Sequence, residues 1–186
     1  MDRPVVEITA AMLEAAGALV HETQVKRTRV SPVDTLGGIL GEFAFAHWLT
    51  GDWRKNEVGS NRGKADLFGL IEIKTSIYPF RESLNLVIRE DYGAKFKDVY
   101  VQNIINVADA YRKDIVPGTQ VIICGFATHA QATSKPAEPM TMKGGARTPY
   151  GVFKMPISSL QPMAGFKPFF EALAREKGVT LDYRNA

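Results

Sequence analysis

Two acidic residues and one lysine lie close together in the chain, among short apolar segments. They are Asp66, Glu72 and Lys74, and Gly69 lies between the two acids. Two carboxylates can bind a divalent metal ion, which activates a bound water for attack on a phosphodiester. A lysine beside them can orient that water and offset negative charge in the transition state. No other stretch of the sequence carries reactive residues in so specific an arrangement.

Glu72 and Lys74 are two positions apart, so in a β-strand their side chains point to the same face. Ile71 and Ile73 then point to the other face, into a core. This alternation predicts a strand with one polar face and one buried face.

The position of Asp66 follows from a predicted turn over residues 68–70. Such a turn pairs Leu67 with Ile71 and so places Asp66 opposite Glu72, with Cβ atoms about 4.5–5.5 Å apart. A slip of one residue would bury an acid, so the apolar pattern selects this register. Two facing carboxylates repel each other unless a cation lies between them, and oxygen ligands suit Mg²⁺ or Mn²⁺. The alternative is an exposed hairpin with ordinary surface charges.

Glu42 is the only acidic residue in the otherwise apolar segment 35–50. Apolar residues on nearly every side of a helix indicate that the helix is buried, and a buried carboxylate is costly without a partner. One interpretation places Glu42 at the metal site, and the alternative is a salt bridge to a nearby Arg or Lys. The glycines of this helix, Gly37, Gly38 and Gly41, would let a neighbouring backbone approach closely.

The order of these residues resembles the PD-(D/E)XK nuclease superfamily, which has the restriction-endonuclease-like fold. The matching elements are a helix with Gly41-Glu42, then Asp66, then Ile71-Glu72-Ile73-Lys74. The likeness covers about residues 33 to 107 and is to small, often phage-associated members. Ala65 stands where the motif name has proline, which is a common departure. The resemblance implies an α/β fold with a central mixed β-sheet flanked by helices.

The resemblance also implies a reaction, the hydrolysis of DNA phosphodiester bonds with Mg²⁺ or Mn²⁺. Asp66 and Glu72 would bind the metal, and the backbone carbonyl of Ile73 would add a ligand. Lys74 would orient the attacking water, and Glu42 would hold a second metal or a metal-bound water. Two alternatives stay open. One is a catalytically inactive DNA-binding or protein-binding module with the same fold, and the other is a nuclease directed at RNA, since the site chemistry does not involve the sugar.

Basic residues near the candidate site and in a later loop form a predicted phosphate-contacting set. Lys and Arg bind phosphate oxygens with salt-sensitive affinity that does not depend on base sequence. The set is Arg62, Lys64, Arg81, Lys143 and Arg147, with Tyr150 available for stacking. The alternative is that these loops are charged because they are solvated. Because one site must cut two strands, we further expect a homodimer or a structured DNA substrate.

The composition fits one globular domain over residues 1–186. Its 45% hydrophobic residues suffice for one core, and its net charge of +3 suits a nucleic-acid partner without requiring one. The single cysteine, Cys124, excludes an internal disulfide and favours a reducing compartment, so we expect the cytoplasm of a bacterium or of a phage-infected host cell. No apolar stretch is long enough for a membrane span, and no signal-peptide pattern begins the chain.

Hydrophobic periodicity predicts the elements around the candidate site. An N-terminal amphipathic helix is expected over about 7–25 with Thr9 as its N-cap, and a short strand over 53–58. Buried strands are expected over 99–107 and 119–127. Frequent proline and glycine predict a long surface loop over about 134–149.

Overall fold

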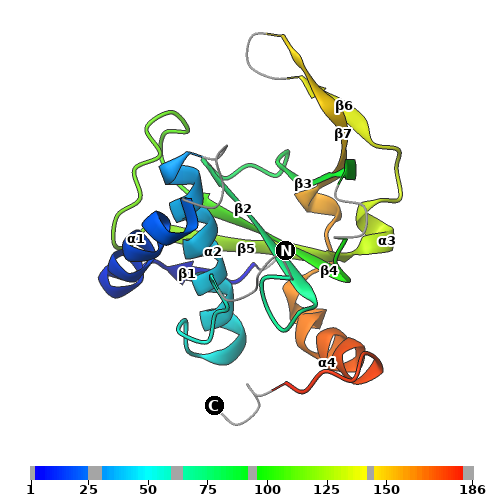
Figure 1. Cartoon of the computed structure of the whole chain (residues 1–186), viewed down its shortest axis with the longest axis horizontal. Coiled ribbons are helices and arrows are strands. Elements are labelled where there is room, and N and C mark those ends of the chain that lie inside the picture. Colours follow the sequence, from blue (N-terminus) through cyan, green and yellow to red (C-terminus); the bar gives the residue numbers. More distant parts are fainter. Residues whose placement is uncertain (1–2, 25–30, 60–64, 92–95, 142–144, 182–186) are drawn as a thin grey trace.

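The protein is a mixed α/β structure built around a mixed sheet with helices against it. The computed structural model describes residues 3–24, 31–59, 65–91, 96–141 and 145–181. The central sheet contains, in spatial order, β1 (Val5–Glu7), β5 (Gln120–Thr128), β4 (Val99–Asn106) and β2 (Ile71–Tyr78). β2 runs parallel to β4, whereas the other neighbouring strands are antiparallel. β2 is therefore an edge strand of this sheet within the described part of the chain (Figure 1).

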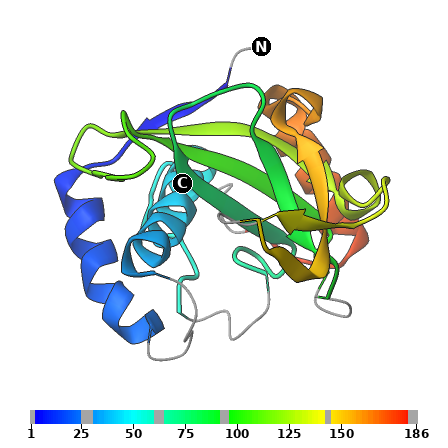
Figure 2. The ribbon, with the colours of Figure 1, turned by 90° about the horizontal axis from the view of Figure 1, so that it is seen from above.

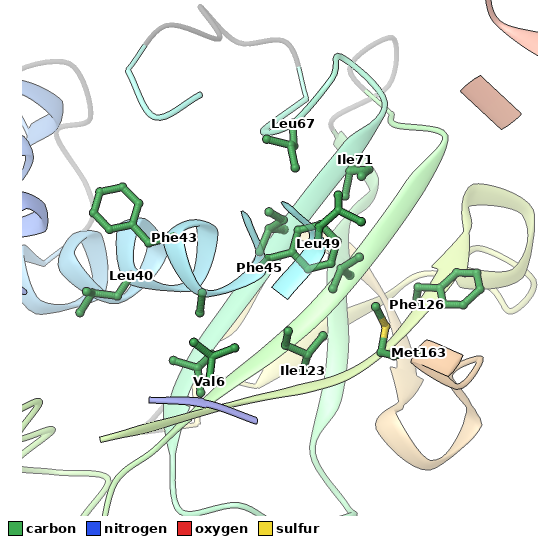
Figure 3. Packing of buried hydrophobic residues seen from close by; sticks show 14 of the residues in the cluster. Val6, Leu40, Phe43, Phe45, Leu49, Leu67, Ile71, Ile123, Phe126 and Met163 are labelled. Carbon is green, nitrogen blue, oxygen red and sulfur yellow. The ribbon is translucent and has the colours of Figure 1, made fainter. Parts of the chain in front are cut away.

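Helices cover one face of the central sheet. α2 (Pro32–Thr50) lies against β2, and α1 (Ala10–Gln24) packs on α2 (Figure 2). α4 (Phe166–Glu176) adds Phe166 and Phe170 to the same apolar cluster. In Figure 3, Phe45 and Leu49 of α2 lie beside the strands near Ile71, and Leu40 and Phe43 belong to the same apolar cluster.

A second, smaller sheet covers the other face. It consists of β3 (Asn85–Arg89), β7 (Arg147–Pro156) and β6 (Glu138–Thr141), all antiparallel, in the order β3-β7-β6. The short helix α3 (His129–Ala132) and the 3-10 turns η2 (Ile157–Ser159) and η3 (Met163–Gly165) complete the described elements here. A second apolar cluster fills this face, with Leu86, Ile88, Tyr100, Ile104, Cys124, Ala127, Ala132, Ile157 and Leu160.

The helix that carries Glu42 has clear end signals. Ser31 is its N-cap, accepting a hydrogen bond from the Asp34 amide, and Pro32 occupies the first turn, where a proline costs no hydrogen bond. Gly51 ends the helix in the left-handed conformation, with φ 82°, and donates its N–H to the His47 carbonyl. These caps fix the length of α2 and so the position of its middle on the sheet.

The predicted loop over about 134–149 is wrong in its main feature. Residues 138–141 form β6 and residues 147–149 begin β7, and these two strands project from the body of the molecule (Figure 1). Pro139 is tolerated because β6 is an edge strand, where a missing N–H breaks no ladder. The hairpin also buries little of β6, so the sequence lacks the apolar alternation that would reveal a strand.

Two other elements differ from expectation. The N-terminal helix begins at Ala10 rather than near residue 7, because Val5–Glu7 pairs with β5 as β1. Thr9 nevertheless caps the helix, since its Oγ1 accepts the Met12 amide at 3.1 Å. The strand expected over 53–58 is absent: this segment is a series of turns, in which Asn56 Oδ1 accepts the Val58 amide. Within the described residues, no helix is long and apolar enough to cross a membrane.

Candidate functional site

The middle of α2 is pressed against one face of β2. A Cβ on Gly41 would collide with the side chain of Thr75, and one on Gly37 would come within 2.6 Å of Ile77 Cδ1. Asn103 of the neighbouring strand β4 donates its Nδ2 to the Gly41 carbonyl at 3.0 Å. The two glycines are thus sites of close approach between helix and sheet, as the sequence suggested.

Glu72 and Lys74 lie on the opposite face of β2. Their positions alternate with Thr75 and Ile77, which face α2. Lys74 Nζ and Glu72 Oε1 form an ion pair of 2.6 Å, and both side chains are mostly shielded from solvent. The alternation predicted from the sequence is therefore the one the structure has, and it separates the charged pair from the helix.

The turn before β2 also forms as predicted. Leu67 and Ile71 make an antiparallel bridge and exchange two backbone hydrogen bonds of 3.1 Å. Phe68 and Gly69 adopt left-handed backbone conformations, with φ 52° and 70°. Glu57 Oε1 accepts the Phe68 amide at 2.7 Å, and the sequence offered no sign of this support. The apolar face expected from this register is buried, with Ala65, Leu67, Ile71 and Ile73 each at most 8% exposed.

Asp66 is buried at the outer edge of β2. Its Oδ2 accepts the Ile73 amide at 2.8 Å, so the carboxylate lies beside the backbone that joins Glu72 to Lys74. The strand pairing itself consists of the single Leu67–Ile71 bridge, so the predicted strand pair of Asp66 with Glu72 does not form, and Asp66 is buried against the Ile73 amide instead. Asp66 thus contacts the backbone of β2 at Ile73, on the edge that β4 does not occupy, whereas Glu72 and Lys74 project from a face of the strand.

Glu42 is on α2 and its Oε2 atom is fully buried. Because α2 packs on the face of β2 opposite to Glu72, Glu42 can approach the acid pair only around the outer edge of β2, where Asp66 lies. That Glu42 belongs to the site stays a prediction. Among the described residues, no three His, Cys, Asp or Glu side chains gather closely enough to hold a metal ion.

Two residues of β4 border the charged pair and were not identified from the sequence. In the parallel register Tyr100 lies beside Glu72, and Gln102 lies beside Lys74. Both are 1% exposed. Gln102 Nε2 donates to Ser76 Oγ at 3.4 Å and to the Asn103 carbonyl at 2.7 Å. A buried glutamine inside a run of Val and Ile was the available signal, because a buried amide needs partners.

The surroundings of Tyr100 raise the pKa of its hydroxyl. It accepts the Lys97 amide at 3.0 Å. Burial raises the pKa of the Tyr100 hydroxyl, and the negative charges of Glu72 and Asp98 raise it further. The hydroxyl therefore stays protonated at neutral pH and can act as a hydrogen-bond donor, but not as a base.

Two of the five predicted phosphate-contacting residues, Arg81 and Arg147, lie in the described part of the chain. Arg62, Lys64 and Lys143 lie outside the described residues. Arg81 is exposed and follows the far end of β2 from Glu72, whereas Arg147 is exposed at the start of β7 in the projecting hairpin. Tyr150 is not fully open for stacking, because the Arg89 guanidinium lies 3.8 Å from its ring centroid.

Cys124 offers no alternative nucleophile. Its side chain is buried, and burial raises the pKa of the thiol to about 12. A thiol with such a pKa is almost entirely protonated at neutral pH and is a poor nucleophile.

Comparison with known proteins assigns no family to this chain: no family model matches it, and neither a curated protein nor a solved structure is significantly similar.

Proposed function

We propose that the protein is a metal-dependent nuclease that hydrolyses DNA phosphodiester bonds. One observation carries the proposal: the buried Asp66 carboxylate is hydrogen-bonded to the backbone between Glu72 and Lys74, which themselves form an ion pair. We infer that two carboxylates and an ammonium group serve one site around this segment of β2, with Asp66 at its edge and Glu72 and Lys74 on its face. This is the residue set that metal-assisted hydrolysis of a phosphodiester requires.

The arrangement of elements supports a restriction-endonuclease-like core. A buried helix with Glu42 is followed by a tight turn, by the strand with Glu72 and Lys74, and then by β4, which is parallel to that strand. The order matches the sequence resemblance to PD-(D/E)XK nucleases. We propose this finer description of the fold on that basis.

The oxygen atoms around Asp66 suit Mg²⁺ or Mn²⁺. Mg²⁺ in enzymes is commonly bound by one or two carboxylates and keeps several waters, so three protein carboxylates are not required. Asp66 and Glu72 would supply the carboxylates. The Ile73 amide points to the outer edge of β2, toward Asp66, and the carbonyl of the same residue points to the same side of an extended strand. That carbonyl is therefore placed to add a third oxygen.

The side chains around the proposed metal would orient water and stabilise charge on the phosphate. A bound metal would supply Lewis acidity and a more acidic water. Lys74 is held at the site by its ion pair with Glu72, where its ammonium can orient a water and offset charge on the scissile phosphate. The Tyr100 side chain lies beside Glu72 and can donate a hydrogen bond from its protonated hydroxyl. Glu42 would hold a second metal or a metal-bound water from the helix side.

DNA would be contacted mainly through phosphates. The projecting β6–β7 hairpin carries Arg147 at its outer part, and a two-stranded ribbon of this kind fits a DNA groove. The net charge of +3 favours a polyanion. We propose Arg62, Lys64, Arg81 and Lys143 as further contacts, and a homodimer where both strands of a duplex are cut. RNA cleavage and a catalytically inactive binding module are the competing functions.

The decisive experiment is a cleavage screen with a matched pair of variants. The wild-type protein is incubated with Mg²⁺ or Mn²⁺ and with plasmid, linear duplex, branched and single-stranded DNA, and with RNA. Glu72→Gln keeps the shape of the side chain and removes its charge, and Glu14→Gln makes the same change on the exposed side of α1. We expect cleavage by wild type and Glu14→Gln, and a loss on the order of 10²–10³-fold in Glu72→Gln with an unchanged melting temperature.

The outcomes of this screen separate the competing functions. Cleavage by Glu72→Gln at the wild-type rate would refute the site. Cleavage of RNA alone would reassign the substrate. DNA binding without cleavage under every metal condition would leave the inactive module as the correct description.

A further inference from the structure

A hollow with both polar and apolar lining residues lies between the end of α3 and the end of β7. Its volume is about 140 Å³, many times the ~10–15 Å³ that a single water needs. Its polar lining comes from Lys135, Lys154, Ser134, Ser159 and Gln131, and the described lining residues include no acid. A hollow of this size with only neutral and positive polar groups can take a tetrahedral anion.

The charges at this hollow are not balanced within the described structure. Neither Lys135 nor Lys154 forms an ion pair with any described residue, although seven such pairs occur elsewhere in the described chain. Both lysines are exposed, so each can offer its ammonium group to an anion in the hollow. Serine hydroxyls add donors for the oxygens of that anion. Phosphate is the anion this set suits, since lysine binds phosphate as a point charge.

The hollow shares a face and an end of the central sheet with the Glu72–Lys74 pair. α3 follows directly from Thr128 of β5, which pairs with Val99 of β4, and Val99 pairs with Ile71 at the start of β2. Ala132 of α3 packs in the same apolar cluster as Tyr100, the neighbour of Glu72. A nucleic acid whose scissile phosphate lies at Glu72 would therefore pass on the side of the molecule where the hollow lies.

We propose that this hollow is a second phosphate-binding site for the nucleic-acid substrate. Lys135 precedes β6 and Lys154 is part of β7, so the site lies at the base of the projecting hairpin. It would hold the substrate there while the outer hairpin contacts a more distant part. The phosphate is either an internal phosphodiester or a terminal phosphomonoester. The proposal deepens the nuclease proposal and rests on it for the identity of the ligand.

The first experiment tests phosphate binding in the hollow without DNA or metal. Inorganic phosphate is titrated into ¹⁵N-labelled protein at constant ionic strength, and the amide signals of Ser134 and Ser159 are followed by NMR. We expect saturable shifts in wild type and their loss in Lys135→Gln/Lys154→Gln. A control, Arg112→Gln/Lys167→Gln, removes two exposed charges on the β4–β5 connection and on α4, and should behave as wild type.

The second experiment identifies the source of the phosphate. Binding of short DNA duplexes with a 5′-phosphate or a 5′-hydroxyl is measured over a range of salt concentrations. If the site holds an internal phosphodiester, the double lysine variant binds both duplexes about tenfold more weakly, and the slope of log K against log[salt] shrinks by about 1–2. If it holds a terminal phosphomonoester, only the 5′-phosphorylated duplex loses affinity.

Two results would overturn the proposal. One is a phosphate titration that does not saturate, or that is the same in the double lysine variant as in wild type. The other is DNA affinity with an unchanged salt slope in that variant. Failure of the nuclease proposal gives a different pattern, because saturable phosphate binding would persist in a protein that cleaves no nucleic acid.

Discussion

The two faces of β2 differ in almost every physical respect although they alternate along one strand. The face with Thr75 and Ile77 is in close contact with α2, at a separation that only glycine allows at Gly37 and Gly41. The opposite face carries Glu72 and Lys74, partly open to solvent and bordered by Tyr100 and Gln102 of β4. One face therefore packs against the helix, and the other presents a charged pair.

In our proposal this difference lets a small sheet hold two acids at one strand. Two neighbouring carboxylates repel, which disfavours the folded state unless something else fixes the backbone. Here the packing of α2 on the apolar face, and the Leu67–Ile71 bridge at the start of β2, fix that backbone. Changes on the helix side should thus alter stability, whereas changes on the charged side should alter chemistry.

The largest expected effect on stability is at Ile71, which is fully buried on the helix side. Ile71→Ala leaves a cavity and should lower the free energy of unfolding by about 2–4 kcal/mol. Lys74→Ala, three positions away on the charged face, should change it by less than about 1 kcal/mol, since a partly exposed ion pair contributes little. Urea denaturation of both variants checks the contrast. Equal destabilisation would mean that the charged face also supports the fold.

A smaller effect is expected from a methyl group in the contact between α2 and β2. Gly41→Ala places a Cβ against the Thr75 side chain and should cost about 1–3 kcal/mol. Gly38→Ala is the matched control, because a Cβ there meets nothing within 4 Å. It should be neutral or stabilise by about 0.5–1 kcal/mol through better helix propensity. Thermal unfolding of the two variants measures this difference. A Gly41→Ala variant as stable as wild type would disprove the close contact.

The smallest effect is expected at Glu42, which links the two faces in our proposal. Glu42→Gln keeps the shape and removes the charge. If Glu42 serves the site, cleavage falls by about tenfold, equivalent to about 1.4 kcal/mol, at unchanged stability. If Glu42 instead stabilises the helix through a salt bridge, the melting temperature falls and the cleavage rate of the remaining folded protein is unchanged. Parallel measurements of rate and melting temperature distinguish the two.

The part of the site that could be predicted from the sequence is the part set by local alternation. Isoleucine at positions 71 and 73 forces Glu72 and Lys74 onto the other face, and the same pattern selects the Leu67–Ile71 pairing. The glycines in the middle of α2 were equally visible, because they lie within one helix. These are short-range constraints that the order of residues contains.

The remainder depends on contacts between distant segments. The neighbours of the charged pair, Tyr100 and Gln102, are set by the parallel register of β2 and β4, which no local pattern specifies. β1 was missed because three residues are too few to show alternation. The β6–β7 hairpin was predicted as a loop because its prolines and glycines outweighed its weak strand pattern. In each case pairing with another strand decided the structure.

The central claim, that Asp66 and Glu72 form a divalent metal site on the charged side of β2, is tested most directly by calorimetric titration with Mn²⁺. Wild type should show saturable binding that is lost in Asp66→Ala and in Glu72→Ala. Lys74→Ala should retain most of that binding, because the lysine is placed to act on water and phosphate and not on the metal. Mn²⁺ binding in Glu72→Ala and Asp66→Ala that equals binding in wild type would contradict the account.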